Sequence, residues 1–198
     1  KIEDTGAGDY TAPAVRALIN RGKRAIRIDL KQAQGRALLL RLAREADVLV
    51  EGFRPGVMQR LGVGYDAVAA VNTRLVYCSI SGFGQHGPLA SHPGHDINYL
   101  SLTGVADQVG NAHGPALSNL PIADLLGGTA GAVKAILAAL FAAARTGQGQ
   151  HLDVSIWSGA DRFIQALLAR RSEIRRRDRS TWLDRIRDWM DRYPVMVP

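Results

Sequence analysis

The sequence has almost no cysteine, which limits how its fold can be held together. Cys78 is the single cysteine among 198 residues, and it stands in the apolar run "LVYCSI". One cysteine cannot form an internal disulfide, so the fold must depend on packing and hydrogen bonds. Such cysteine usage is typical of a reducing compartment, and we expect the protein in the cytoplasm.

The sequence also lacks an uninterrupted apolar run of the length that a bilayer requires. Its first residues, "KIEDTGAGDY", are polar and have no apolar segment of the secretory type. Hydrophobic residues make up 46% and charged residues 22% of the chain, a mixture typical of globular proteins. We therefore expect no membrane partner.

Positive charge is in excess, but its distribution argues against nucleic acid as a partner. The net charge is +7, and much of it lies in Ala169–Arg192, where arginine alternates with aspartate and glutamate. This alternation favours a solvated helix face. Neither a zinc-ligand spacing nor an RNA-binding aromatic signature accompanies it. A small polyanionic ligand remains compatible with the charge.

Strand and helix signals alternate along the first half of the chain. Predicted strands are "RAIRIDL" (24–30), "VLVEGF" (48–53), "RLVYCSISGFG" (74–84) and, later, "QHLDVSIW" (150–157), and predicted helices are 31–47, a short stretch after Pro55, and 125–147, which Gly147 ends. This order predicts an α/β fold with a parallel, Rossmann-like sheet and flanking helices. The remainder from Ser158 is predicted to be helical.

Two titratable residues stand out after the strands. His95 lies in "GHDINYL", and Asp124 lies in the apolar segment "PIADLLGG". Histidine titrates near neutrality, and an aspartate in apolar surroundings has a raised pKa, so together they suit proton transfer at one carbon. The alternative is structural: Asp124 as a helix cap and His95 as a hydrogen-bonded loop residue.

Glycines and basic residues form two further groups. The glycines at 82, 84, 87, 94, 127 and 128 permit close approach of backbone to a ligand, or serve ordinary turns. The segment "GFGQHG" lacks the context of a dinucleotide-binding fingerprint. Lys31, Arg54 and Arg60 can hold phosphates together, or each can be a surface charge.

The blocks "NRGKRAIRIDLK", "ADVLVEGFRPGVMQRLGVGYD", "LVYCSISGFGQHGP", "GHDINYLSLTG", "IADLLGG" and "GQGQHLDVSIWSGA" resemble family III CoA transferases of the CaiB/BaiF type. This family includes formyl-CoA transferase, carnitine CoA-transferases and alpha-methylacyl-CoA racemase, the member that the chain resembles most. The similarity runs from about Asn20 to Ala160. It implies the large-domain core of that fold and a coenzyme A thioester as substrate, with no tightly bound cofactor and no metal.

The resemblance assigns roles to individual residues. Coenzyme A contacts fall on Ile28, Asp29, Leu30, Lys31, Gly52, Phe53, Arg54 and Arg60, and the thioester end of the pocket falls on Gly94, Asp96, Ile97, Asn98 and Tyr99. In racemases the positions of His95 and Asp124 carry the two acid/base groups. In the transferases the aspartate instead takes an acyl group, and a tyrosine or phenylalanine usually replaces His95.

His95 therefore favours a racemase acting at the α-carbon of a 2-methylacyl-CoA. A CoA transferase that uses Asp124 as its nucleophile is the alternative. A truncated, non-catalytic CoA-binding or assembly partner is a third hypothesis. The resemblance also implies a homodimer.

The resemblance divides the chain into two parts. Residues 1–160 are expected to form the CoA-binding α/β domain without the family's first strand. Residues 161–198 are expected to be a helical tail that resembles the family's return segment, with the second domain absent and a central block missing around Asp161–Ser172.

Overall fold

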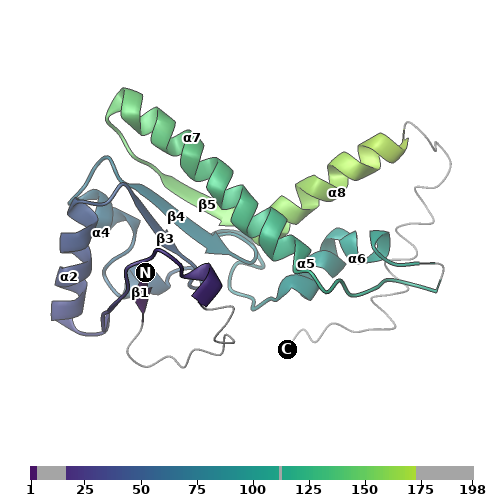
Figure 1. The fold of residues 1–198 in the computed structure, drawn as a ribbon, viewed down its shortest axis with the longest axis horizontal. Helices are drawn as coiled ribbons and strands as arrows, with labels where there is room; N and C mark the ends of the chain where they lie inside the picture. Colours follow the sequence, from purple (N-terminus) through teal and green to yellow (C-terminus); the bar gives the residue numbers. More distant parts are fainter. Residues whose placement is uncertain (4–16, 112, 173–198) are drawn as a thin grey trace.

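The computed structural model of the chain describes residues 1–3, 17–111 and 113–172. Most of the basic run Ala169–Arg192 and most of the predicted C-terminal tail lie outside these residues. Figure 1 shows a sheet with helices on both sides, and two longer helices, α7 and α8, that diverge from a common region.

The strands and helices follow the predicted order. The strands are β1 (Ile2–Glu3), β2 (Ile26–Arg27), β3 (Val48–Glu51), β4 (Val76–Ser81) and β5 (His151–Ser155). The helices are α2 (Ala33–Arg44), α3 (Val57–Arg60), α4 (Tyr65–Ala69), α5 (Asp96–Thr103), α6 (Val105–Gln108), the π-helix η1 (Ala123–Ala130), α7 (Gly131–Thr146) and α8 (Ile156–Ser172).

The strands are parallel, as predicted. β3, β4 and β5 form one sheet in that order, with Val50 opposite Cys78 and Cys78 opposite Leu152. β1 and β2 form a separate parallel pair, and the predicted strand at 24–30 is ordered as a strand only at Ile26 and Arg27. The fold is thus mixed α/β with a parallel sheet and flanking helices.

The two faces of β4 pack against different helices because alternate side chains of a strand point in opposite directions. Leu75 and Tyr77 join the cluster that includes Ala43 of α2 and Val68 of α4. Cys78 packs on the other face with Val154 of β5 and Ala132 of α7. The central strand is consequently buried on both sides, as parallel sheets require.

The predicted long helix exists, but it is composite. Residues 123–130 are π-helical and run directly into α7, which ends at Gly147 with φ of 74°. Glycine adopts this left-handed backbone conformation without steric cost, so the predicted stop signal is confirmed. The π-helical start could not be read from the apolar pattern.

The continuous helix Ala123–Thr146 corrects the expectation about apolar length. With 24 residues it is long and apolar enough, by length and composition, to cross a membrane, and it is the one such helix among the described residues. One such helix is weak evidence for a membrane span, and 22% of its apolar window is buried in the protein. α7 packs on β4 and β5, and Lys134 lies near the start of α7, at the middle of the 24-residue helix.

η1 and α8 cross with their backbones in contact. A Cβ placed on Gly127 would overlap the carbonyl oxygen of Ile156, and one on Gly159 would overlap the backbone of Gly127. Only glycine permits this approach. At this contact η1 passes the start of α8, and α8 follows β5 directly in the chain.

Gly127→Ala should therefore lower the free energy of unfolding, by roughly 1–3 kcal/mol, because the two backbones must separate. Gly131→Ala is the matched control on the same helix. The nearest atom to its added methyl is Val154 Cγ1 at 3.6 Å, an ordinary contact. Because alanine favours helix by up to about 1 kcal/mol over glycine, the control should be neutral or stabilising. Urea denaturation followed by circular dichroism measures both, and equal stabilities for Gly127→Ala and the parent protein would contradict the close crossing.

Candidate active site

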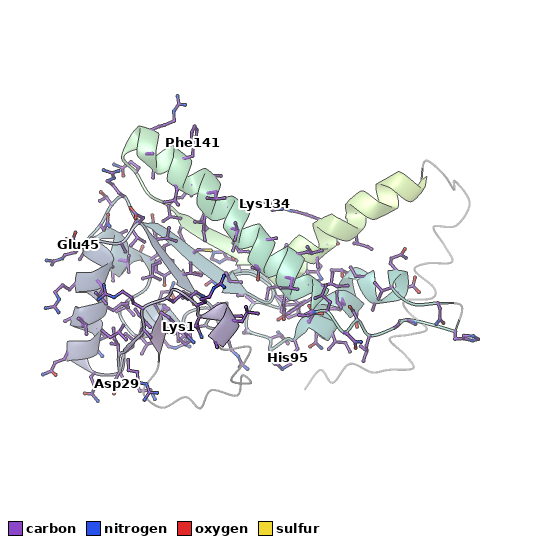
Figure 2. All side chains as sticks on the ribbon, viewed as in Figure 1. Lys1, Asp29, Glu45, His95, Lys134 and Phe141 are labelled. Atoms are coloured by element: carbon purple, nitrogen blue, oxygen red, sulfur yellow. The ribbon has the colours of Figure 1, made fainter. Side chains whose placement is uncertain are left out.

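The predicted proton-transfer residues lie beyond the carboxyl ends of the parallel strands. The chain leaves β4 at Ser81 and enters a loop that leads to α5, while β5 leads at once into α8. Ligands bind at this edge in open α/β sheets. Figure 2 shows His95 at the start of α5, on the side of the molecule away from α2.

His95 precedes the first residue of α5 and is exposed. Its backbone is extended, and its N–H donates to Asn98 Oδ1 at 2.9 Å. This contact fixes where the helix begins, and His95 is exposed. The Asn98 and Tyr99 N–H groups donate to the His95 carbonyl oxygen at 2.9 and 3.4 Å, so the earlier amides of the first turn, those of Asp96 and Ile97, are the backbone donors that α5 can offer beside His95.

Asp124 is the second residue of η1, and its backbone is fixed by a hydrogen bond to α5. The preceding residue, Ala123, is fully buried, whereas Leu125 and Leu126 are exposed. The Asp124 N–H donates to Asp96 Oδ1 at 2.8 Å, which joins the start of η1 to the start of α5. The predicted alternative, Asp124 as a helix cap, does not hold: the cap position is Ile122, and no side chain caps this helix.

Asp96 and His95 act electrostatically on Asp124. Burial is the largest cause that raises the pKa of Asp124, the Asp96 carboxylate raises it further, and His95 lowers it. The predicted upward shift in the pKa of Asp124 is thus present, and His95 is one of the two charged neighbours that act on it. A carboxyl group with a raised pKa exchanges protons more readily near neutral pH.

Tyr99 fills the space between the two ends of the loop that joins β4 to α5. Its hydroxyl lies against the Cα of Gly82 and the Cα of Gly94, and a Cβ on Gly94 would come within 2.6 Å of that hydroxyl. Its ring packs edge-on against Phe83, with centroids 5.2 Å apart. Burial first, then Asp124 and Asp96, raise the pKa of Tyr99, so its phenol stays protonated beside the two carboxyls.

The remaining glycines serve the protein's own packing and turns. Gly128 meets Ile156 of α8, as Gly127 does, while Gly84 and Gly87 have φ of 91° and 104°. At positions 82, 94, 127 and 128, side chains or backbone of the chain itself fill the space beside the glycine. The structural interpretation of the glycines is thus the better one at these four positions.

Sequence reasoning missed two carboxylates that order the strand ends. Asp153 Oδ2 accepts the Gln85 N–H at 2.9 Å, and Glu51 Oε2 accepts the Phe53 N–H at 2.8 Å. Each carboxylate thereby shapes a loop at the carboxyl edge of the sheet. The signal in the sequence was a single acidic residue near a strand end, which is too common to single out.

The residues predicted to contact coenzyme A lie at two places. Gly52, Phe53 and Arg54 follow β3 at the carboxyl edge, and Arg60 ends α3 shortly after. Asp29 and Lys31 follow β2, and Asp29 accepts the backbone N–H of Lys31 at 2.9 Å. Figure 2 shows Asp29 and His95 well apart, so a ligand that contacts both must be elongated.

The side chains in this set differ in exposure. Lys31, Phe53, Arg54, Arg60 and Ile97 are exposed, and Asp29, Leu30, Asp96 and Asn98 are half-buried. Ile28 and Tyr99 are buried, so they can offer a ligand little more than their backbone.

Comparison with known proteins identifies the family. The sequence profile of CoA-transferase family III matches residues 1–185. The chain belongs to CoA-transferase family III.

Two curated relatives and a solved structure show how far the similarity extends. Acetyl-CoA:oxalate CoA-transferase of Acetobacter aceti is 42% identical over 179 residues, which cover 85% of this chain and 46% of that protein. Alpha-methylacyl-CoA racemase of Homo sapiens is 44% identical over 145 residues, covering 71% and 37%. A CAIB/BAIF family protein from Brucella suis superimposes with a TM-score of 0.72 at 35% identity, covering 79% and 41%.

The family's named relatives are enzymes of two kinds, CoA transferases and racemases. The chain spans less than half the length of the curated relatives given above. The predicted family and fold are thus confirmed. The specific reaction is a matter for proposal.

The raised pKa of Asp124 predicts how stability depends on pH. A carboxyl whose pKa in the folded state exceeds its ordinary value of 3.8 stabilises the fold below that value, and this stabilisation is lost as the pH rises through the folded pKa. Asn resembles the protonated acid, so Asp124→Asn should be more stable than the parent at pH 7. The gain should disappear below about pH 4.

Thermal unfolding at a series of pH values measures this difference. Asp66→Asn is the control, because Asp66 is an exposed carboxylate in the first turn of α4. Its loss at a helix start should be neutral or slightly destabilising at pH 7. An Asp124→Asn protein that is less stable than the parent at pH 7 would show that the ionised carboxylate is favourably placed.

Proposed function

We propose that the protein acts on acyl-CoA thioesters, and that His95 and Asp124 remove and return the proton on the α-carbon of a 2-methylacyl-CoA. The observation that supports this most is the meeting of the α5 and η1 starts, which brings His95, Asp96 and Asp124 together at the carboxyl edge of the sheet. In a racemase, one group takes the proton from one face of the carbon and the other supplies a proton to the opposite face.

The thioester makes this chemistry accessible. A thioester carbonyl acidifies the α-hydrogen, and removal of that proton places negative charge on the carbonyl oxygen. Backbone amides at the start of α5 can donate to such an oxygen, as donors aimed at developing charge do in enzymes. Asp124 accepts or gives a proton most effectively when its pKa approaches the working pH, which is the direction of its shift.

In the same proposal, basic residues at the loop ends bind the phosphates of coenzyme A. Lys31, Arg54 and Arg60 are exposed and belong to loops or to a helix end beside the carboxyl edges of the strands. Guanidinium and ammonium groups bind phosphates through charge-assisted hydrogen bonds. The distance between Asp29 and His95 suits a ligand with its phosphates at one end and its thioester at the other.

We also propose that the protein forms a homodimer and is located in the cytoplasm. One observation supports self-association: Val133, Leu137 and Phe141 of α7 are 51%, 61% and 66% exposed, and they recur at every fourth position on one side of the helix. Apolar side chains that form such a row are usually covered by another surface.

A CoA transferase is the second candidate, and the comparison with Acetobacter aceti favours it. That transferase matches a longer stretch of the chain than the human racemase does. In this reaction the Asp124 carboxylate attacks the thioester carbonyl, an acyl–aspartyl anhydride forms, and the coenzyme A thiolate leaves. The thiolate then attacks the Asp124 carbonyl carbon, which releases the donor acid and leaves a coenzyme A thioester on Asp124. The acceptor carboxylate displaces the thiolate from this thioester, and the thiolate attacks the acceptor carbonyl of the new anhydride, which forms the acceptor's thioester and frees Asp124.

Solvent exchange separates the two reactions. A 2-methylacyl-CoA incubated with the protein in deuterated water, without an acceptor acid, should gain deuterium at its α-carbon. Asp124→Asn and His95→Ala should each slow racemisation by roughly 10²–10⁴-fold, the usual contribution of an acid–base group. His95→Ala is expected to retain slow one-sided exchange through Asp124. Mass spectrometry and chiral analysis follow both quantities.

The outcomes differ for each hypothesis. A transferase shows no exchange, forms an acyl group on Asp124 that hydroxylamine traps, and tolerates His95→Ala. Exchange that persists in a double Asp124→Asn, His95→Ala variant would remove both residues from the reaction. Coenzyme A binding with neither exchange nor trapping would support a non-catalytic role.

Arg60→Ala should weaken coenzyme A binding by roughly 1.5–3 kcal/mol, because it removes a charge-assisted contact to phosphate. Arg41→Ala is the control, since Arg41 is an exposed arginine in the last turn of α2. Isothermal titration with coenzyme A measures both variants. Equal affinity in the parent and Arg60→Ala proteins would exclude Arg60 from the binding site.

A further inference from the structure

One hydrogen bond connects the two segments that carry the proposed proton-transfer residues. Asp96 is the first residue of α5, Asp124 is the second residue of η1, and the Asp124 N–H donates to Asp96 Oδ1 at 2.8 Å. The two residues are 28 positions apart in the chain. A carboxylate acceptor makes this bond charge-assisted and stronger than a neutral one.

From this contact we infer that Asp96 is a positioning residue for Asp124: its carboxylate fastens the start of η1 to the start of α5 and keeps a second negative charge beside the Asp124 carboxyl. The inference deepens the proposed function and rests on it for the role of Asp124. The role of Asp96 is separate from the pocket-lining role that the sequence suggested, because its Oδ1 is directed at a backbone amide of the protein.

The packing beneath the bond leaves the two helix starts little freedom. Ala123, adjacent to Asp124, is fully buried in the cluster that also contains Tyr99 and Leu100 of α5 and Ala160 of α8. A displacement of either helix start would have to disturb this cluster. Within it, the bond fixes the rotation of the first turn of η1, which decides where the Asp124 side chain emerges.

The charge of Asp96 has an effect of its own. After burial, Asp96 is the largest cause that raises the pKa of Asp124, while its neighbour His95 lowers it. Two consecutive residues thus act on Asp124 in opposite directions. A protonated His95 beside an ionised Asp124, and the reverse arrangement, are the two states that a racemase alternates between, and Asp96 opposes an excessive bias toward ionised Asp124.

Other titratable groups lie on the elements packed against η1, among the residues whose side chains the structure describes. They are Tyr99 on α5, His151 and Asp153 on β5, Lys134 and Arg145 on α7, and Asp161 and Arg162 on α8. The two neighbours that shift the pKa of Asp124 are Asp96 and His95. Removing the charge of Asp96 should therefore lower the pKa of Asp124, since the opposing influence of His95 remains.

Two substitutions separate the bond from the charge. Asp96→Asn removes the charge and keeps an oxygen that can accept the Asp124 N–H, whereas Asp96→Ala removes both. The pKa of Asp124 should fall in both variants. Hydrogen exchange of the Asp124 amide should accelerate by roughly tenfold or more in Asp96→Ala, and much less in Asp96→Asn. Asp66→Asn, a charge-matched control on α4, should change neither quantity.

The measurements are a carbon-13 NMR titration of the Asp124 carboxyl, assigned through its loss in Asp124→Asn, and amide exchange by NMR. An Asp124 titration that is unchanged in Asp96→Asn, or an Asp124 amide that exchanges as slowly in Asp96→Ala as in the parent, would overturn the inference. Should Asp96→Ala fail to fold, the Asn variant still decides the titration, and Asp96→Leu, which keeps a similar side-chain size without an acceptor, decides the bond through the exchange of the Asp124 amide.

Activity adds a readout that separates this inference from the proposed function. If Asp124 is a base, the rate of deuterium incorporation rises with pH through its pKa, and this limb should move to lower pH in Asp96→Asn together with the NMR titration. Normal NMR behaviour in the parent with no exchange and no trapping would refute the proposed function and leave the positioning role intact. Exchange in the parent, together with an Asp124 titration that does not move in Asp96→Asn, would refute the positioning role of Asp96 and leave the proposed function intact.

Discussion

The contact between Gly127 and Gly159 determines how the site is assembled. It is a contact of backbone with backbone, so no rotamer change can relieve it, and it holds η1 directly against the first turns of α8. α5 packs against both helices through the cluster around Tyr99, Ala123 and Ala160. Two helix starts that are distant in sequence are thereby brought to one place beyond the sheet.

The sheet contributes the other half of that assembly. β5 leads into α8 without a loop, and the backbone N–H of Trp157 donates to the carbonyl oxygen of Gly82 at 2.9 Å. The end of β4 and the start of α8 are therefore tied to each other. Tyr99 then closes the space between Gly82 and Gly94, so the loop that carries His95 is supported from the strand side as well.

Much of this fold could be predicted from the sequence, because its signals are local. The apolar runs at β3, β4 and β5, the periodic leucines of α2 and the stop at Gly147 each reflect a preference of a short segment. The family blocks pointed to His95 and Asp124 for the same reason: each block is continuous in sequence. The structure confirmed the order of elements and the parallel sheet, and it joins the segments of His95 and Asp124 through Asp96, while the roles of both residues stay predictions.

What escaped prediction depends on residues far apart in the chain. η1 is π-helical and crosses α8 at Gly127, and the bond from Asp124 to Asp96 spans 28 positions. Among the described residues, the long strand expected at 24–30 is paired only at Ile26 and Arg27, with Ile2 and Glu3 of β1. The glycines at 82 and 127 had the same appearance in sequence as ligand-facing glycines, although side chain and backbone of the protein itself fill the space beside them.

The placement of Asp124 shows why such a site costs stability. Burial and a neighbouring carboxylate both disfavour its ionised form, and a fold selected for stability alone would separate Asp96 from Asp124. Instead, the carboxylate of Asp96 is fastened to the amide of Asp124, so the two acids cannot move apart without losing a hydrogen bond. The favourable bond to the backbone thus maintains an unfavourable proximity of charges, and strain of this kind is a common feature of sites where protons are exchanged.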